Sequence, residues 1–155
     1  MLVFAWLIIA VDQFVKNLLI ATLEAGVPVD FLGSVVRLNL TFNDSAAFSI
    51  GFGATWIFTI ISSAAVLVLI WFSFKIETIG WATMAGVLLG GVTGNLIDRL
   101  MREPGFAVGH VVDYIQVPFN FPIFNIADMA IFIICSLSVI RILRGDQIGR
   151  KRVSV

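Results

Sequence analysis

The amino-acid sequence predicts an α-helical membrane protein: a bundle of four transmembrane helices with a small extracytoplasmic β-sheet between the first and second helices. Composition is the first observation, since 59% of the residues are hydrophobic, 13% are charged, and the mean hydropathy is +1.03. Soluble domains contain about half apolar and about a quarter charged residues. Secondly, four apolar segments each approach the roughly 20 residues that a membrane-spanning helix needs. Thirdly, polar and apolar residues alternate after the first of these segments.

The four predicted helices cover approximately residues 2–21, 54–74, 79–96 and 123–143. Because the chain has 155 residues, what remains serves as connections, and we expect a single integral-membrane domain over residues 1–155. The second and third helices are joined by only a few residues around Lys75, whereas the other two connections are long. Both long connections therefore lie on the same side of the membrane.

Basic residues predict which side this is, because cytoplasmic loops carry an excess of Lys and Arg. The short connection and the C-terminal segment hold Lys75, Arg141, Arg144, Arg150, Lys151 and Arg152, against Arg37, Arg99 and Arg102 on the other side. We therefore expect both termini in the cytoplasm and both long connections on the extracytoplasmic face. The first helix is interpreted as a retained span, since it contains Asp12 and Lys16 and lacks the basic start of a signal peptide.

The first long connection contains a predicted strand at residues 35–43, where the side chains alternate. Its apolar face is expected to cover the bundle and its polar face to line a cleft. The two faces consist of Val36, Leu38, Leu40 and Phe42, and of Arg37, Asn39, Thr41 and Asn43. The second long connection, residues 99–122, is rich in aromatic and β-branched residues and is expected to pack at the membrane interface.

Charge and residue counts exclude several classes of function. The formal net charge is zero and the basic residues are dispersed apart from a short tail, so no nucleic-acid surface is expected. A single histidine, His110, and a single cysteine, Cys135, do not make a zinc cluster, and we expect neither a metal nor another cofactor. His110 is interpreted as a loop residue and Cys135 as a small buried hydrophobic residue. The sequence contains no nucleophile elbow, so we do not expect a serine triad.

Two patterns in the helices have structural explanations. Asp12 precedes Lys16 by about one helical turn, which favours an ion pair that allows both charges to enter the membrane. The same pair would also border a polar site. Gly86, Gly90 and Gly94 form a stripe of small residues, which is typical of closely packed transmembrane helices rather than of a nucleotide-binding loop.

Three short polar segments, residues 94–99, 110–114 and 124–128, are candidates for chemistry because charged side chains cost free energy at membrane depth. Asp98 beside Arg99 fits a salt bridge as well as a catalytic acid, and Asn125 with Asp128 resembles a capping box. Asp113 is a further carboxylate in the connection that leads to Asp128. If these two approach each other, they share one proton, which is the chemistry of an aspartic peptidase.

Taken together, these motifs closely resemble those of the bacterial lipoprotein signal peptidases, also called signal peptidase II. The resemblance covers essentially the whole chain, and the motifs occur in the family's order. They are Asp-x-x-x-Lys at 12–16, Asn-Asp-Ser-Ala-Ala-Phe at 43–48, Gly-Gly-Val-Thr-Gly-Asn-Leu-Ile-Asp-Arg at 90–99, Val-Val-Asp at 111–113 and Phe-Pro-Ile-Phe-Asn-Ile-Ala-Asp at 121–128.

The resemblance implies an aspartic endopeptidase of the bacterial inner membrane. Such an enzyme removes the signal peptide from prolipoproteins immediately before a diacylglyceryl-modified cysteine, and it is inhibited by the cyclic peptide globomycin. Its partners are these substrates and membrane lipid, and the small sheet corresponds to the family's cradle over the site. The family's catalytic pair falls on Asp113 and Asp128. Its supporting polar residues fall on Asp12, Lys16, Asn43, Asn95, Asp98, Arg99 and Asn125.

Two positions depart from the family pattern: Ser45 replaces a usual glycine and Tyr114 a usual phenylalanine. Serine adopts positive φ less readily than glycine, so the first change bears on the loop conformation. Two other classes of function compete with the peptidase. A proton-coupled carrier or channel would use the same carboxylates as a relay, and a membrane scaffold protein would use the glycine stripe as an interface.

Overall fold

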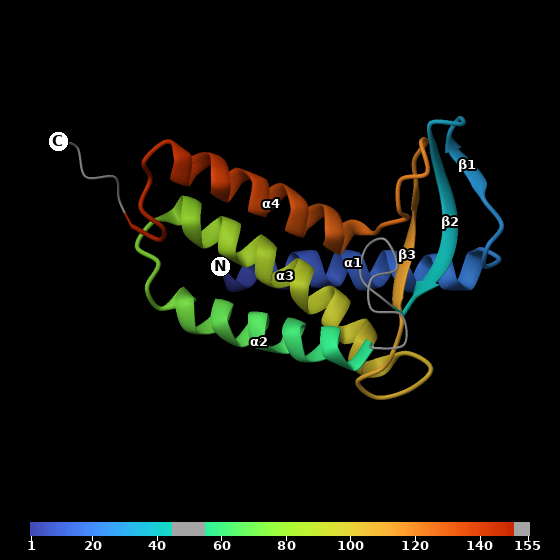
Figure 1. The fold of residues 1–155 in the computed structure, drawn as a ribbon, viewed down its shortest axis with the longest axis horizontal. Helices are drawn as coiled ribbons and strands as arrows, with labels where there is room; N and C mark the ends of the chain where they lie inside the picture. The colour runs from blue at the N-terminus through green and yellow to red at the C-terminus, as the bar shows by residue number, and fades with distance from the viewer. Residues whose placement is uncertain (45–54, 151–155) are drawn as a thin grey trace.

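The computed structural model describes residues 1–44 and 55–150 of the chain. Four helices, α1 (Leu2–Thr22), α2 (Thr55–Ser73), α3 (Ile79–Met101) and α4 (Ile126–Leu143), form an elongated bundle (Figure 1). Each is long and apolar enough to cross a membrane. The predicted fold of four membrane-spanning helices and a small sheet is confirmed.

Two helix ends differ from their predicted positions. Helix α3 continues past residue 96 to Met101, because the charged side chains of its last turns find partners on α1 and do not require a loop in water. Helix α4 begins at Ile126 rather than at residue 123, because Phe124 forms an isolated bridge with Ile115 and Asn125 is the N-cap. Both differences come from contacts with distant parts of the chain.

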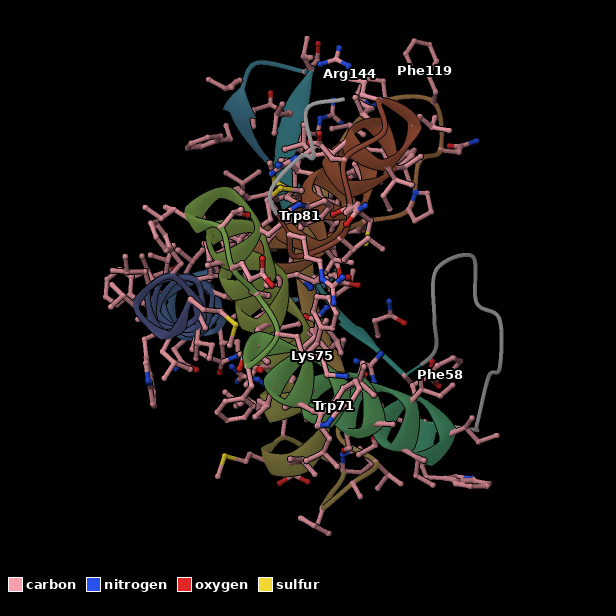
Figure 2. All side chains as sticks on the ribbon, turned by 90° about the vertical axis from the view of Figure 1, so that its left-hand side faces the viewer. Phe58, Trp71, Lys75, Trp81, Phe119 and Arg144 are labelled. Carbon is pink, nitrogen blue, oxygen red and sulfur yellow. The ribbon has the colours of Figure 1, made fainter. Side chains whose placement is uncertain are left out.

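Helix α3 lies in the middle of the bundle and packs against each of the other three helices (Figure 2). Its glycines explain the close approach. A Cβ atom at Gly90 would lie 2.8 Å from the carbonyl oxygen of Ala5 on α1, and one at Gly91 would lie 2.7 Å from that of Ala127 on α4. The predicted packing role of the glycine stripe is confirmed, and Gly91 extends it to a second helix.

The sheet has three antiparallel strands in the order β1 (Val29–Leu32), β2 (Val36–Asn43) and β3 (Val111–Gln116). Strand β2 was predicted. Strand β3 comes from the second long connection, which was expected to pack at the interface, and it pairs with β2 through residues that are far apart in sequence. No local alternation marked it, because most of its side chains are buried on both faces.

A bulge in β2 changes the predicted faces of that strand. Leu38 pairs with Ile115 and Thr41 with Asp113, so two residues of β2 face Tyr114 alone. As a result the expected apolar face is interrupted: Leu40 is buried, whereas Phe42 is 48% exposed. Of the predicted polar face, Thr41 and Asn43 line the cleft and Arg37 and Asn39 do not. Phe42, which was expected to cover the bundle, lines the cleft as well.

The sheet stands at one end of the bundle, opposite the short connection between α2 and α3 (Figure 1). Leu19 of α1 packs there with Leu40, Val112 and Tyr114 of the sheet. At the other end, Lys75 lies over the ring of Trp71 and Arg141 over that of Trp81. Figure 2 shows Trp71, Lys75 and Trp81 from this end. Aromatic side chains next to basic ones are typical of a membrane interface.

The prediction for Cys135 is wrong, because its side chain is exposed on the surface of α4 rather than buried. Cys135 lines a cavity that is open at the surface of α4, so burial does not follow from an apolar segment alone.

Candidate active site

A cavity of about 1210 Å³ lies where β2, β3, α3 and the first turns of α4 meet. Its polar part is lined by Asn43, Asp44, Asn95, Arg99, Asp113 and Asp128. Its apolar part follows α4 through Met129 and Phe132 as far as Cys135. The cavity therefore joins a group of carboxylates and amides to a lipid-like surface within the membrane-spanning region.

Asp113 is placed by β3, opposite Thr41 of β2, and its side chain is almost completely buried. Its two carboxylate oxygens accept hydrogen bonds from neutral amides, at 2.6 Å from Asn125 Nδ2 and 2.8 Å from Asn43 Nδ2. Burial, followed by the nearby charge of Asp128, raises the pKa of Asp113 to about 7. This carboxyl group can hold a proton near neutral pH.

Asp128 lies in the first turn of α4 and forms a complete capping box with Asn125. Its Oδ2 accepts the backbone N–H of Asn125 at 3.2 Å, and the side-chain oxygen of Asn125 accepts the N–H of Asp128 at 2.9 Å. Its other oxygen, Oδ1, accepts the side-chain amide of Asn95 at 2.7 Å. The capping role predicted for this pair is confirmed, and the capped carboxylate also faces the cavity.

The amide of Asn125 ties the two carboxyl groups together, since it caps the helix of one and donates to the other. It also donates to Asn95 Oδ1 at 3.2 Å. Within residues 1–44 and 55–150, no Lys or Arg forms an ion pair with Asp113 or Asp128. Neutral donors of this kind position two carboxyl groups without neutralising them.

A second set of charges lies between α1 and α3, and we call Asp12, Lys16, Asp98 and Arg102 the ionic cluster. Lys16 Nζ is 2.8 Å from Asp12 and 2.7 Å from Asp98, and all three side chains are completely buried. The predicted pair of Asp12 with Lys16 is confirmed. The predicted salt bridge between Asp98 and its neighbour Arg99 is not formed. Asp98 pairs instead with Lys16 and, at 2.6 Å, with Arg102, one helical turn away.

The ionic cluster touches each element that carries the two cavity carboxylates. Asp12 accepts the N–H of Ala127 at 3.1 Å, and Asp98 accepts the N–H of Val112 at 3.2 Å. Lys16 donates to Asn95 Oδ1 at 2.9 Å, which leaves the Nδ2 group of Asn95 to donate to Asp128. These bonds hold the beginning of α4 and the strand β3 in fixed positions relative to α1 and α3.

Arg99 lies apart from these bonds. It lines the cavity, lies over the ring of Phe58 at 5.8 Å, and donates to its own helix at the carbonyl oxygen of Asn95, 3.5 Å away. Its Nε atom is buried and has no hydrogen-bond partner in the part of the chain that the structure describes. The guanidinium group thus lies at the cavity wall and is held by its own helix and by Phe58.

Sequence reasoning missed three contributors. Gln13 donates to both Asp12 and Asp98, and Arg102 donates to Gln13 and to Asn17. The hydroxyl group of Tyr114 accepts the N–H of Ile126 at 3.3 Å and so satisfies another amide at the start of α4, while burial raises its pKa. The periodicity of α1 could have indicated Gln13, which lies beside Asp12, whereas only the fold brings Tyr114 to α4.

The remaining predicted residues do not line the cavity or lie outside the described part of the chain. His110 precedes β3, and its backbone N–H donates to Glu103 O at 2.9 Å. Residues 45–48, with the unusual Ser45, lie outside the described residues. No group of three or more metal-ligating side chains occurs among residues 1–44 and 55–150.

The family profile described as signal peptidase (SPase) II matches residues 4–144. A lipoprotein signal peptidase of Leifsonia xyli subsp. xyli is 44% identical over 141 residues, which cover 91% of this chain and 65% of the relative. One of Mycolicibacterium smegmatis is 37% identical over 155 residues, covering 98% and 66%. The chain thus spans about two thirds of the length of these relatives.

Solved structures of bacterial membrane enzymes have the same fold. One, at 2.3 Å resolution, has a TM-score of 0.84 and 27% sequence identity, covering 99% of this chain and 92% of the other. A second, at 1.9 Å resolution, has a TM-score of 0.81 and 28% identity, covering 93% and 92%.

Proposed function

The chain belongs to the signal peptidase II family, and on that premise we propose that it is an aspartic endopeptidase of the bacterial inner membrane. Its substrates are prolipoproteins, from which it removes the signal peptide. The observation that carries the proposal is that Asp113 and Asp128 line one cavity and are joined by the amide of Asn125. Asp12, Lys16, Asn43, Asn95, Asp98, Arg99 and Asn125 act in support.

In the proposed reaction Asp113 and Asp128 hold one proton between them. The ionised carboxylate takes a proton from a water molecule as the oxygen of that water bonds to the scissile carbonyl carbon, and the protonated partner donates a hydrogen bond to the carbonyl oxygen. The tetrahedral intermediate then collapses, the C–N bond breaks, and a carboxyl proton passes to the leaving amine. A pKa of about 7 at Asp113 supports proton sharing near neutral pH.

The shape of the cavity supports a lipid-modified substrate. Its polar part holds the carboxylates, and its apolar part along α4 suits acyl chains or an apolar peptide. We propose cleavage immediately before a diacylglyceryl cysteine, whose acyl chains would occupy the apolar part. Globomycin would compete for the same cavity.

The sheet end is proposed to face away from the cytoplasm, with both termini in the cytoplasm. Single cysteines at Glu24 and Glu77, both exposed and at opposite ends of the molecule, test this in a Cys135→Ser background. An impermeant thiol reagent added outside intact cells should label the first and spare the second. The reversed pattern would overturn the orientation.

The decisive experiment is cleavage of a synthetic diacylglyceryl prolipoprotein by the purified protein in the presence of EDTA. Release of a peptide that ends immediately before the lipidated cysteine supports the proposal. The same peptide without the diacylglyceryl group is the control, and it should be cut much more slowly. A protein that is folded but cuts neither substrate would favour the carrier or scaffold alternatives.

A further inference from the structure

Two turns at the sheet end expose large apolar side chains. The first consists of the end of β1 and its connection to β2, where Phe31, Leu32 and Val35 are each 63% exposed. The second follows β3 at residues 117–121 and exposes Phe119 by 99%. In Figures 1 and 2 both turns lie on the side of α4, and Phe119 points away from the bundle. We call them the paired turns.

The paired turns are neighbours. Ser34 of the first turn, Arg37 at the beginning of β2, and Val117 and Pro118 of the second turn line the same hollow of about 240 Å³. Arg37 forms an ion pair with Asp30 at 3.0 Å, so the exposed apolar groups surround a pair of charges that cancel. The surface is apolar in its outer parts and has no net charge from this pair.

The position of the paired turns along the membrane normal indicates what covers this surface. The sheet packs on Leu19 of α1, next to Leu18 and Ile20, which are 48% and 36% exposed on a membrane-spanning helix. In Figure 1 the C-terminal part of α1 runs alongside the sheet. The sheet therefore lies at the depth of the last turns of a membrane-spanning helix, which places the exposed side chains of the paired turns at the membrane boundary.

The second turn has a backbone suited to projecting a side chain. Its ends are tied by the hydrogen bonds between Ile115 and Phe124, at 2.7 and 3.1 Å, and Phe121 contacts Phe124 edge to face. At its tip Phe119 and Asn120 have φ of 68° and 53°. Positive φ is unfavourable for a bulky residue, so this backbone conformation costs free energy. The phenyl ring that it projects is almost fully exposed.

From these observations we propose that the paired turns insert into the outer leaflet and anchor the mouth of the cavity in lipid. Residues 120–124 line that mouth, and the chain continues directly into Asn125, which holds Asp113. Insertion of Phe119 thus fixes the opening at the depth where a lipidated substrate lies. Because Asp30 and Arg37 cancel, the anchor needs a bilayer but no particular lipid charge.

The test uses a fluorescent label at Phe119→Cys, with Cys135→Ser to remove the native thiol. The protein is placed in phosphatidylcholine vesicles that contain lipid nitroxide-labelled near the headgroup. We expect the nitroxide to quench the label at least about twofold more strongly than one at Glu24→Cys, since interfacial side chains are buried roughly 5–10 Å into the headgroup boundary. Aqueous iodide should show the opposite order.

Equal access of iodide to both labels would overturn the proposal. So would headgroup nitroxide that quenches the label at 119 no more strongly than the label at 24, or shielding found only in vesicles with phosphatidylglycerol. A second measurement rests on the proposed function: Phe119→Asp should raise KM for a lipidated substrate about threefold in vesicles, whereas Phe119→Trp should not. The quenching result does not depend on activity, so the two proposals fail separately.

Discussion

Two groups of carboxylates, which lie side by side in this molecule, have opposite surroundings. In the ionic cluster Asp12 and Asp98 contact Lys16, and Asp98 also contacts Arg102. In the cavity Asp113 and Asp128 accept hydrogen bonds only from amide groups among the bonds that the described residues show. The two groups meet at Asn95, which accepts from Lys16 and donates to Asp128.

The difference shows how one residue type serves two purposes within a membrane. A cation in contact with a carboxylate offsets part of the cost of burying its charge, whereas neutral amide donors leave the carboxylate without a countercharge. We therefore expect the ionic cluster to act as a structural support and the cavity pair to carry out the proposed proton transfer. Substitutions in the ionic cluster and in the cavity pair, made separately, test whether the two groups have these different roles.

The largest effect is expected from Asp113→Asn and Asp128→Asn. Each change keeps the side-chain shape but removes a titrating proton, so the rate of peptide cleavage should fall by about 10,000-fold. The measurement is single-turnover cleavage of a lipidated prolipoprotein. Asp146→Asn, which changes an aspartate at the opposite end of the molecule, is the matched control and should cleave normally. Near-normal cleavage by either cavity variant would remove that residue from the catalytic pair.

Asp98→Asn should act mainly on stability. It leaves Lys16 with one carboxylate fewer and Arg102 without its acid, and breaking a buried ion pair costs about 3 kcal/mol or more in the free energy of unfolding. At matched concentrations of folded protein we expect about tenfold slower turnover, equivalent to about 1.4 kcal/mol of lost positioning.

A folded Asp98→Asn variant without any turnover, together with an active Asp113→Asn variant, would reverse the roles of the two groups. Asp98 and Asp128 would then be the better candidates for the catalytic pair.

The pH dependence of stability should also separate the two groups. Because the pKa of Asp113 is raised to about 7, the folded state holds a proton that the unfolded state has lost above about pH 4. The free energy of unfolding therefore falls as pH rises from about 4 to about 7, by up to about 4 kcal/mol, and Asp113→Asn removes this dependence.

Melting temperatures in detergent, measured at pH 5 and pH 8, check this expectation. The variant should gain stability relative to the original chain on going to the higher pH. A constant difference between the two proteins would show that Asp113 is ionised throughout this range.

The smallest effect is expected from Arg102→Met. This side chain is 19% exposed and Asp98 keeps Lys16, so the free energy of unfolding should fall by about 1 kcal/mol. Cleavage by the folded variant should stay within about threefold of normal, since Arg102 contacts neither cavity carboxylate. Arg102→Lys should recover part of the stability, and a total loss of activity would place Arg102 in the site.

Much of the fold could be predicted because its signals are local. Apolar length and composition placed four helices, and alternation placed β2. The helix ends at Met101 and Ile126 were missed because they depend on α1 and on Ile115, which are remote in sequence. Strand β3 was missed because burial on both faces removes the alternation that identifies a strand.

The sequence by itself determined the membrane environment, the helix periodicity of Asp12 and Lys16, the capping box of Asn125 and Asp128, and the family motifs. All of these depend on residues within about one helical turn of each other or on composition. Only the tertiary structure decided which partners Asp98 and Asp113 have. Asp98 forms an ion pair with Lys16 of α1 and not with its neighbour Arg99. Asp113 accepts hydrogen bonds from Asn43 and Asn125. Pairing follows distance in space, and distance in space is set by how the helices and the sheet pack.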